Sequence, residues 1–143
     1  MKNLLFDNGD KMPALGLGTW KSKPNEVYEA VLHAIKVGYR HIDCAYVYKN
    51  ENEIGQAISE AIAKGLVKRE DLWITSKLWN DSHLPQDVLP AVKNTLKDLQ
   101  LDYLDLYLVH WPIALKKGVG IPSDPNDFLT KEQAPLAETW AEM

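Results

Sequence analysis

Residues 38–51 read Gly-Tyr-Arg-His-Ile-Asp-Cys-Ala-Tyr-Val-Tyr-Lys-Asn-Glu, and the rest of the chain is organised around this stretch. It places a carboxylate, Asp43, where a short apolar strand ends, and a phenol, Tyr48, in the turn that follows. A lone ionised carboxylate at the end of a buried strand loses its hydration and regains little in return. The stretch therefore predicts a cationic partner for Asp43 elsewhere in the sequence.

Two later apolar strands also end in ionisable side chains. The segment 72–77, Leu-Trp-Ile-Thr-Ser-Lys, ends at Lys77, and the segment 104–110, Leu-Asp-Leu-Tyr-Leu-Val-His, ends at His110. Lys77 is the cation that Asp43 requires. Ionisable groups at the ends of successive strands predict one site, built at one edge of a parallel sheet.

Helical patterns separate these strands. A short strand with two glycines, 15–19, comes first, and apolar residues then recur at helical spacing in the segments 24–37, 51–64 and 85–99. Alternating strands and helices imply a parallel sheet whose consecutive strands are neighbours, because crossover connections are right-handed. The sequence therefore predicts an α/β fold.

The spacing of the strand ends indicates which α/β fold this is. The ends lie 25, 34 and 33 residues apart, in the order Gly18, Asp43, Lys77 and His110. A (β/α)8 barrel of the TIM type uses about 31 residues per unit. Active sites of such barrels lie at the carboxyl ends of the strands. This fold class therefore brings the ionisable groups together.

The sequence supplies the first four strand-helix units of such a barrel. A fourth helix starts near Pro135 and still continues at Trp140. We interpret residues 1–143 as the N-terminal half of a single barrel domain. Four strands cannot close a barrel, and open strand edges pair readily with other chains. Self-association is therefore expected.

Two further segments lie outside these units. Residues 4–13 contain Asn8-Gly9 between apolar residues, which predicts a hairpin with a two-residue turn. Residues 113–133 are irregular and contain several glycines and prolines. A loop of this length is typically either a functional lid or disordered.

Composition and charge exclude several classes of function. The chain has 143 residues, of which 45% are hydrophobic and 25% charged, as is typical of soluble globular proteins. A net charge of −4 gives no basic surface for nucleic acid, and the apolar runs are too short to span a membrane. The histidines lack the spacing of metal ligands, so no metal is expected. A single cysteine and no recognisable secretory signal predict a cytoplasmic location.

The predicted site is suited to proton transfer. A free phenol holds its proton too tightly to release it near neutrality, but a neighbouring ammonium favours the phenolate. Tyr48, backed by Lys77 and Asp43, is therefore a candidate general acid, and His110 can hydrogen-bond a carbonyl oxygen. No side chain is an obvious nucleophile for the carbonyl carbon, so a bound hydride donor is expected.

Four segments carry a resemblance to a known family. They are Leu-Gly-Leu-Gly-Thr-Trp at 15–20, the stretch 39–53, Ser-Lys-Leu-Trp-Asn at 76–80, and 101–112 with its final His-Trp-Pro. Together they resemble the aldo-keto reductases, closest to the aldose and aldehyde reductase branch. The resemblance implies a reductase of aldehydes or ketones whose hydride donor is a nicotinamide cofactor, usually NADPH, with NADH left open. It also implies that the hairpin covers the bottom of the barrel, away from the site.

The resemblance also assigns roles to particular residues. The family's catalytic tetrad corresponds to Asp43, Tyr48, Lys77 and His110. Its cofactor-binding positions correspond to Gly18, Thr19, Trp20, Lys21 and Asp43. Its substrate-binding positions correspond to Trp20, Val47, Tyr48, Trp79, His110 and Trp111. In the family, the remaining cofactor contacts come mainly from the second half of the barrel.

A non-catalytic protein is the alternative. Taken alone, each tetrad residue is more often structural, for example a turn tyrosine or a core histidine, whereas their joint position at strand ends favours a reductase site. The alternative is a half-barrel or regulatory relative that binds partners or nucleotide through the same fold. Cys44, Trp73 and Trp140 are expected to pack in the core.

Overall fold

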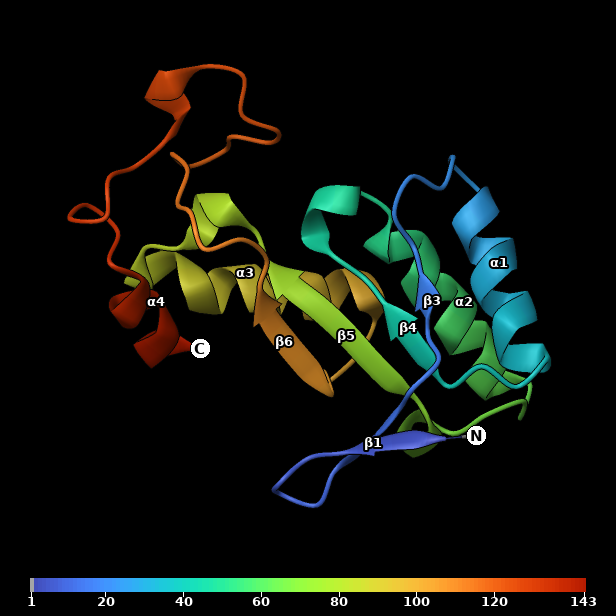
Figure 1. Ribbon diagram of the computed structural model, residues 1–143. Helices are drawn as coiled ribbons and strands as arrows, with labels where there is room; N and C mark the ends of the chain where they lie inside the picture. Colours follow the sequence, from blue (N-terminus) through green and yellow to red (C-terminus); the bar gives the residue numbers. More distant parts are fainter. Residues whose placement is uncertain (1) are drawn as a thin grey trace.

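A parallel sheet forms the centre of the structure, a computed structural model that describes residues 2–143 (Figure 1). Within these residues the strand order is β3-β4-β5-β6, and all neighbouring pairs are parallel. The strands are β3 (Leu17–Gly18), β4 (His41–Asp43), β5 (Trp73–Leu78) and β6 (Leu106–Val109). The predicted parallel sheet with consecutive strands as neighbours is confirmed.

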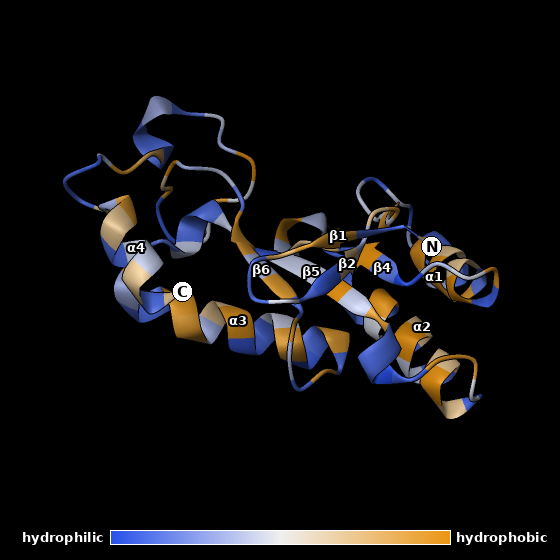
Figure 2. Ribbon diagram, turned by 60° about the horizontal axis from the view of Figure 1, so that its bottom comes forward, coloured by the Kyte–Doolittle hydropathy of each residue, from blue (hydrophilic) through white to orange (hydrophobic). Residues whose placement is uncertain are grey.

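Four α-helices follow these strands in the described part of the chain. They are α1 (Glu26–Lys36), α2 (Glu51–Ala63), α3 (Pro85–Leu99) and α4 (Leu136–Glu142). They lie on one side of the sheet and pack in chain order, α1 against α2, α2 against α3 and α3 against α4. Apolar and polar residues alternate along the helix ribbons in Figure 2, as expected for helices that bury one face.

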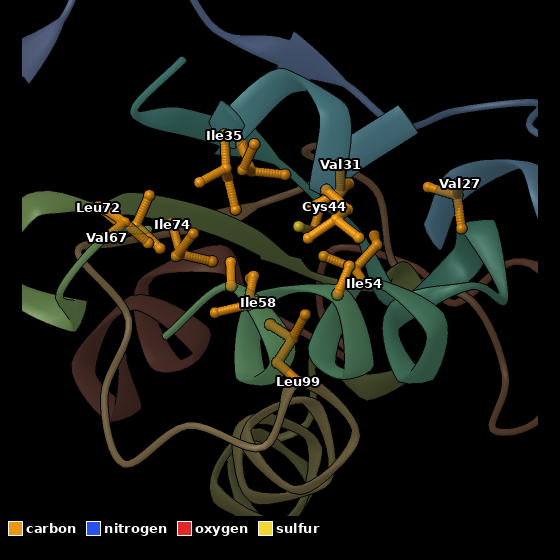
Figure 3. Packing of buried hydrophobic residues seen from close by; sticks show 14 residues of the cluster. Val27, Val31, Ile35, Cys44, Ile54, Ile58, Val67, Leu72, Ile74 and Leu99 are labelled. Atoms are coloured by element: carbon orange, nitrogen blue, oxygen red, sulfur yellow. The ribbon is translucent and has the colours of Figure 1, made fainter. Parts of the chain in front are cut away.

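The main core lies between the sheet and the helices (Figure 3). Successive residues of a strand point to opposite faces, and Ile42 of β4 and Ile74 of β5 point to the helix side, where both are fully buried. Cys44 is buried in the same cluster, so its predicted packing position is confirmed. The other buried members are Val27, Val31, Leu32, Ile35, Ile54, Ala57, Ile58, Ala61, Val67, Leu72 and Leu99.

The opposite face of the same strands carries the ionisable groups. In the sheet register, Gly18 lies beside Asp43, Asp43 beside Thr75, and Lys77 beside Leu108. Lys77 and Thr75 are two residues apart on β5, so they share a face with Asp43. The register therefore places the carboxylate and the ammonium on the face that the helices leave uncovered.

A hairpin covers the amino ends of the strands. β1 (Asn3–Leu5) pairs antiparallel with β2 (Lys11–Pro13), as predicted. Its loop is one residue longer than expected, because the Gly9 N–H donates to the Phe6 carbonyl at 2.9 Å and Gly9 adopts a φ of 91°. Phe6 stacks on Trp73, the first residue of β5, with ring centroids 5.7 Å apart. The hairpin thus lies at the end of the sheet away from Asp43.

Two details of the sequence prediction are corrected by the structure. Lys77 does not end its strand, because β5 continues to the buried Leu78. Trp73 is buried as expected, but Trp140 is 70% exposed. In α4 the preceding residue, Thr139, is the buried one, and neighbouring helix residues point about 100° apart. Burial of Thr139 therefore directs Trp140 towards solvent.

Gly55 allows α2 and α3 to pack closely. A Cβ added at Gly55 would lie 2.5 Å from the carbonyl oxygen of Asp98 and 2.7 Å from the carbonyl carbon of Leu99. We predict that Gly55→Ala lowers the free energy of unfolding by about 1–3 kcal/mol, although Ala is the better helix former. Urea unfolding measures the change, with Gly120→Ala as control, because a Cβ there meets no atom within 4 Å. An unchanged midpoint for Gly55→Ala would contradict the tight packing.

Candidate active site

Lys77 is the predicted cationic partner of Asp43. The Lys77 Nζ lies 2.8 Å from Asp43 Oδ1 and also donates to the Cys44 carbonyl oxygen at 2.7 Å. The side chain of Lys77 is 12% exposed, and that of Asp43 is 38% exposed. The two acceptors on β4 and its end orient the ammonium group, which has three hydrogens to donate. One hydrogen therefore remains for a group on the far side of Lys77.

Tyr48 lies close to the Lys77 ammonium. It ends the short 3-10 helix Tyr46–Tyr48, which follows β4, and Lys49 after it adopts a left-handed conformation with a φ of 59°. The Lys77 Nζ lies 5.2 Å from the centroid of the Tyr48 ring. The structure thus brings Tyr48 close to the Asp43–Lys77 ion pair.

His110 lies directly after β6 and completes the group. Its ring centroid is 5.8 Å from that of Tyr48, and the two rings are nearly perpendicular, at 81°. The Nδ1 atom of His110 is buried and has no hydrogen-bond partner among residues 2–143. Burial, and to a smaller extent the Lys77 ammonium, lowers the pKa of His110 below its ordinary value of 6.5. The neutral imidazole, which can donate one hydrogen bond, is therefore favoured near neutrality.

An aromatic cavity of about 160 Å³ opens beside Tyr48 and His110. The Trp79 ring lies 5.2 Å from the ring of His110 and 5.2 Å from that of Trp111. The cavity combines apolar walls with one phenol and one imidazole, which suits a small apolar molecule with one polar atom. The structure gathers all six residues predicted to bind substrate around it, and its full lining is Trp20, Val47, Tyr48, Trp79, His110, Trp111 and Ile121.

Ile121 was not predicted to belong to this cavity. It is 71% exposed and lies in the irregular stretch 113–133, where no periodic pattern marks which side chains border the cavity. The stretch is held in place by the indole of Trp79, whose Nε1 donates to the Val119 carbonyl oxygen at 2.9 Å. The adjoining loop residues also bind the chain after β5, with Lys117 contacting Asp87 and Gly118 contacting Asp81.

The residues predicted to contact a cofactor lie at the ends of β3 and β4. A Cβ added at Gly18 would meet no atom within 4 Å, so the face of the sheet that carries Asp43 is open at this position. The Thr19 side chain is buried and donates to the Asp43 carbonyl oxygen at 2.8 Å. Trp20 is 66% exposed, and the Lys21 Nζ lies 4.5 Å from its ring centroid. Open space on this face, beside an exposed indole and a half-exposed carboxylate, fits a large cofactor with a flat ring and polar groups.

Two buried polar residues beside the tyrosine turn were also not predicted as part of the site. The Asn50 Nδ2 donates to the Thr19 carbonyl oxygen at 2.8 Å. Glu51 accepts hydrogen bonds from Ser76 Oγ at 2.6 Å and from Thr95 Oγ1 at 3.1 Å. Burial raises the pKa of Glu51 from 4.5 to about 7. In the sequence, polar residues at a helix start resemble exposed capping residues, which conceals their burial.

A metal site, a membrane-spanning helix and a reactive thiol each lack support among the described residues. No three His, Cys, Asp or Glu side chains of residues 2–143 gather where they could hold a metal ion. None of the helices within that range is long and apolar enough to cross a membrane. Burial raises the pKa of the Cys44 thiol well above its ordinary value, which disfavours a reactive thiolate.

A protein-family model described as the Aldo/keto reductase family matches residues 14–143. The chain belongs to this family. The solved aldose reductase from Schistosoma japonicum matches this aldo/keto reductase chain with a TM-score of 0.91 and 51% sequence identity, over 99% of this chain and 48% of that protein. The fold is therefore that of the N-terminal part of an aldose reductase TIM barrel, as predicted.

Curated relatives match the aldo/keto reductase chain over almost its whole length. An aldo/keto reductase of Synechocystis is 54% identical over 140 residues, which cover 98% of this chain and 43% of the relative. The human aldo-keto reductase family 1 member A1 is 52% identical over 139 residues, which cover 96% of this chain and 43% of the relative. The chain therefore spans less than half the length of the curated relatives it matches. None of these comparisons supports self-association.

We predict that Glu51 makes the stability of the fold depend on pH. Its folded-state pKa of about 7 lies above the ordinary 4.5, so the folded state binds the proton more tightly than the unfolded chain. This tighter proton binding stabilises the folded state fully below about pH 4.5, and the stabilisation is lost as the pH rises to about 7. Gln does not titrate, so as the pH rises from about 4.5 to about 7 the free energy of unfolding of the parent should fall by about 3 kcal/mol relative to that of Glu51→Gln.

Urea unfolding at several pH values measures this difference. The matched control is Glu70→Gln, because the Glu70 side chain is 71% exposed. Parallel stability profiles for Glu51→Gln and the parent would contradict the prediction.

Proposed function

We propose that this chain carries the proton-transfer site and substrate cavity of an NADPH-dependent reductase of aldehydes and ketones. The observation that carries the proposal is that Tyr48 and His110 line one aromatic cavity while the Lys77 ammonium, paired with Asp43, lies 5.2 Å from the centroid of the Tyr48 ring. Membership of the aldo/keto reductase family supports the reaction class.

Tyr48 is the proposed general acid. A carbonyl oxygen in the cavity accepts hydrogen bonds from the Tyr48 hydroxyl and the His110 imidazole, which orient the carbonyl group. Tyr48 gives its proton to this oxygen as the carbonyl carbon gains a hydride, so that the product is an alcohol. Lys77 stabilises the negative charge left on the phenol oxygen, and Asp43 holds the ammonium in place. Tyr48 then regains a proton from solvent.

A nicotinamide cofactor supplies the hydride when bound, and is thereby oxidised. The residues proposed to contact it are Gly18, Thr19, Trp20, Lys21 and Asp43. The open face at Gly18 would let the cofactor approach the backbone of β3, and Asp43 would keep a second carboxylate oxygen available for a hydroxyl group. We propose NADPH, in line with the family resemblance, and NADH is the alternative donor.

The cavity favours a small carbonyl substrate. Its volume of about 160 Å³ and its indole walls suit a compact apolar or aromatic aldehyde. Trp79, which is 2% exposed, supplies a buried apolar wall beside His110. Ile121, on the loop above, is a further wall of the same cavity.

We also propose that residues 1–143 form the first half of one barrel domain and that the protein is cytoplasmic. The second candidate function is a non-catalytic half-barrel that binds partners or nucleotide. The matched region covers 43% of the human relative, so the activity of the relatives' whole chains cannot be carried over to these residues without a test. The activity of the chain itself therefore decides between the two functions.

We predict that Tyr48→Phe lowers the turnover number by about 100-fold to 10,000-fold, because the proton donor is removed while the ring remains. Its affinity for NADPH should not change. The measurements are NADPH oxidation with a simple aromatic aldehyde and fluorescence titration of NADPH.

Tyr46→Phe is the matched control, because Tyr46 belongs to the same turn but not to the cavity lining. Turnover of Tyr48→Phe at the parental rate would remove Tyr48 from the role of acid. A folded parent without turnover would favour the non-catalytic alternative.

We predict that the 143-residue chain self-associates through the open edges of its sheet. Among residues 2–143, β3 and β6 each have a neighbouring strand on one side only, and unpaired edges can pair with a second copy. The exposed Trp140 lies beside β6 and adds apolar surface. Sedimentation velocity over a range of concentrations measures the association.

Trp140→Ser should weaken the association because Trp140 lies beside the edge strand β6. Val37→Ser should not, because the exposed Val37 follows the last residue of α1 and does not lie beside β6. A parent that sediments as a monomer at every concentration would refute the prediction.

A further inference from the structure

Glu51 is a buried carboxylate that joins the two chain segments carrying Tyr48 and Lys77. It is the first residue of α2, three residues after Tyr48, and is 3% exposed. Its Oε1 accepts a hydrogen bond from Ser76 Oγ at 2.6 Å, and Ser76 directly precedes Lys77 on β5. The hydrogen bond therefore links the end of the tyrosine turn to the strand that carries the lysine.

The second oxygen of Glu51 makes a separate contact. Oε2 accepts from Thr95 Oγ1 of α3 at 3.1 Å. Within residues 2–143, no Lys, Arg or His nitrogen lies within 4.0 Å of the carboxylate, so two hydroxyl groups are its hydrogen-bonding partners. Burial of a carboxylate without a cationic partner costs folding free energy. Apolar residues could make the same helix-to-strand contact at a lower cost, which points to a role beyond packing.

The tyrosine turn is also held on its other side. The Asn50 amide donates to the Thr19 carbonyl oxygen, and the Thr19 hydroxyl donates to the Asp43 carbonyl oxygen. Asn50 thus fixes the turn relative to β3 and β4, while Glu51 fixes it relative to β5. The ammonium of Lys77 extends from β5 and is oriented by acceptors on β4, so the position of the turn relative to both strands decides where the ammonium meets the phenol.

We propose that Glu51 is a positioning residue, which acts through Ser76 to hold the Tyr48 turn in register with the Lys77 strand. The proposal rests on the proposed function, since Tyr48 and Lys77 are the groups whose alignment matters for proton transfer. The two arms of the carboxylate then differ in role. The Ser76 arm aligns the phenol and the ammonium, whereas the Thr95 arm attaches α3.

The test removes one arm at a time. Ser76→Ala deletes the hydroxyl that binds Oε1, and Thr95→Val deletes the hydroxyl that binds Oε2 with little change of shape. One readout is the ring resonance of Tyr48 in protein with carbon-13-labelled tyrosine, assigned from its loss in Tyr48→Phe. The other is the turnover number, measured separately from KM in NADPH oxidation with an aromatic aldehyde.

We expect Ser76→Ala to move or broaden the Tyr48 resonance and to lower the turnover number by about 10-fold or more, because small displacements of catalytic groups are costly. Thr95→Val should leave both readouts within twofold of the parent, even if it lowers stability. Glu51→Gln keeps an amide oxygen for Ser76 and should retain the parental Tyr48 resonance. Equal effects of Ser76→Ala and Thr95→Val, or no effect of Ser76→Ala on the resonance, would overturn the proposal.

The two readouts separate this proposal from the reductase function. If the folded parent shows no turnover, the reductase proposal fails, and the Tyr48 resonance still decides whether Glu51 aligns the turn. If the parent turns over and the resonance is unaffected by Ser76→Ala, the reductase function stands and the positioning role fails.

Discussion

The ion pair between Lys77 and Asp43 constrains the rest of the structure. Both charged groups lie at least partly out of water, and each would destabilise the fold if the other were absent. The 2.8 Å contact between them requires that β4 and β5 be adjacent, parallel and in one register. Because parallel strands need crossover connections, α2 must cross from the end of β4 to the start of β5. The helix layer thus follows from the same requirement as the site.

Strand alternation separates the core from the site. On β5, Ile74 and Ser76 point to the helices, whereas Thr75 and Lys77 point to the uncovered face. A shift of register by one residue would place the ammonium of Lys77 in the apolar layer and turn Ile74 towards the site. The buried core therefore fixes the register, and the register in turn positions the catalytic candidates.

The sequence predicts this arrangement well where the signal is periodic. Strand ends and helical spacing are sufficient to bring Asp43, Lys77 and His110 to one edge, and the family resemblance adds the aromatic walls that the structure gathers around Tyr48. Ile121 was missed because its position depends on a hydrogen bond between Trp79 and a distant loop carbonyl. Trp140 was misplaced because α4 has only seven residues, too few to define a buried face from periodicity.

The proposed proton donation by Tyr48 depends on how Lys77 and the tyrosine turn are held by neighbouring residues. Two of the three hydrogens of the Lys77 ammonium are taken by Asp43 and by the carbonyl of Cys44, so β4 sets the direction of the third. The position of the phenol relative to that hydrogen depends on how the turn after β4 is attached to its neighbours. Asn50 and Glu51 make these attachments from opposite sides, through Thr19 and Ser76. In the proposed reaction, the side chains that align the phenol and the ammonium are therefore buried residues outside the cavity lining, and their burial explains why the sequence conceals them.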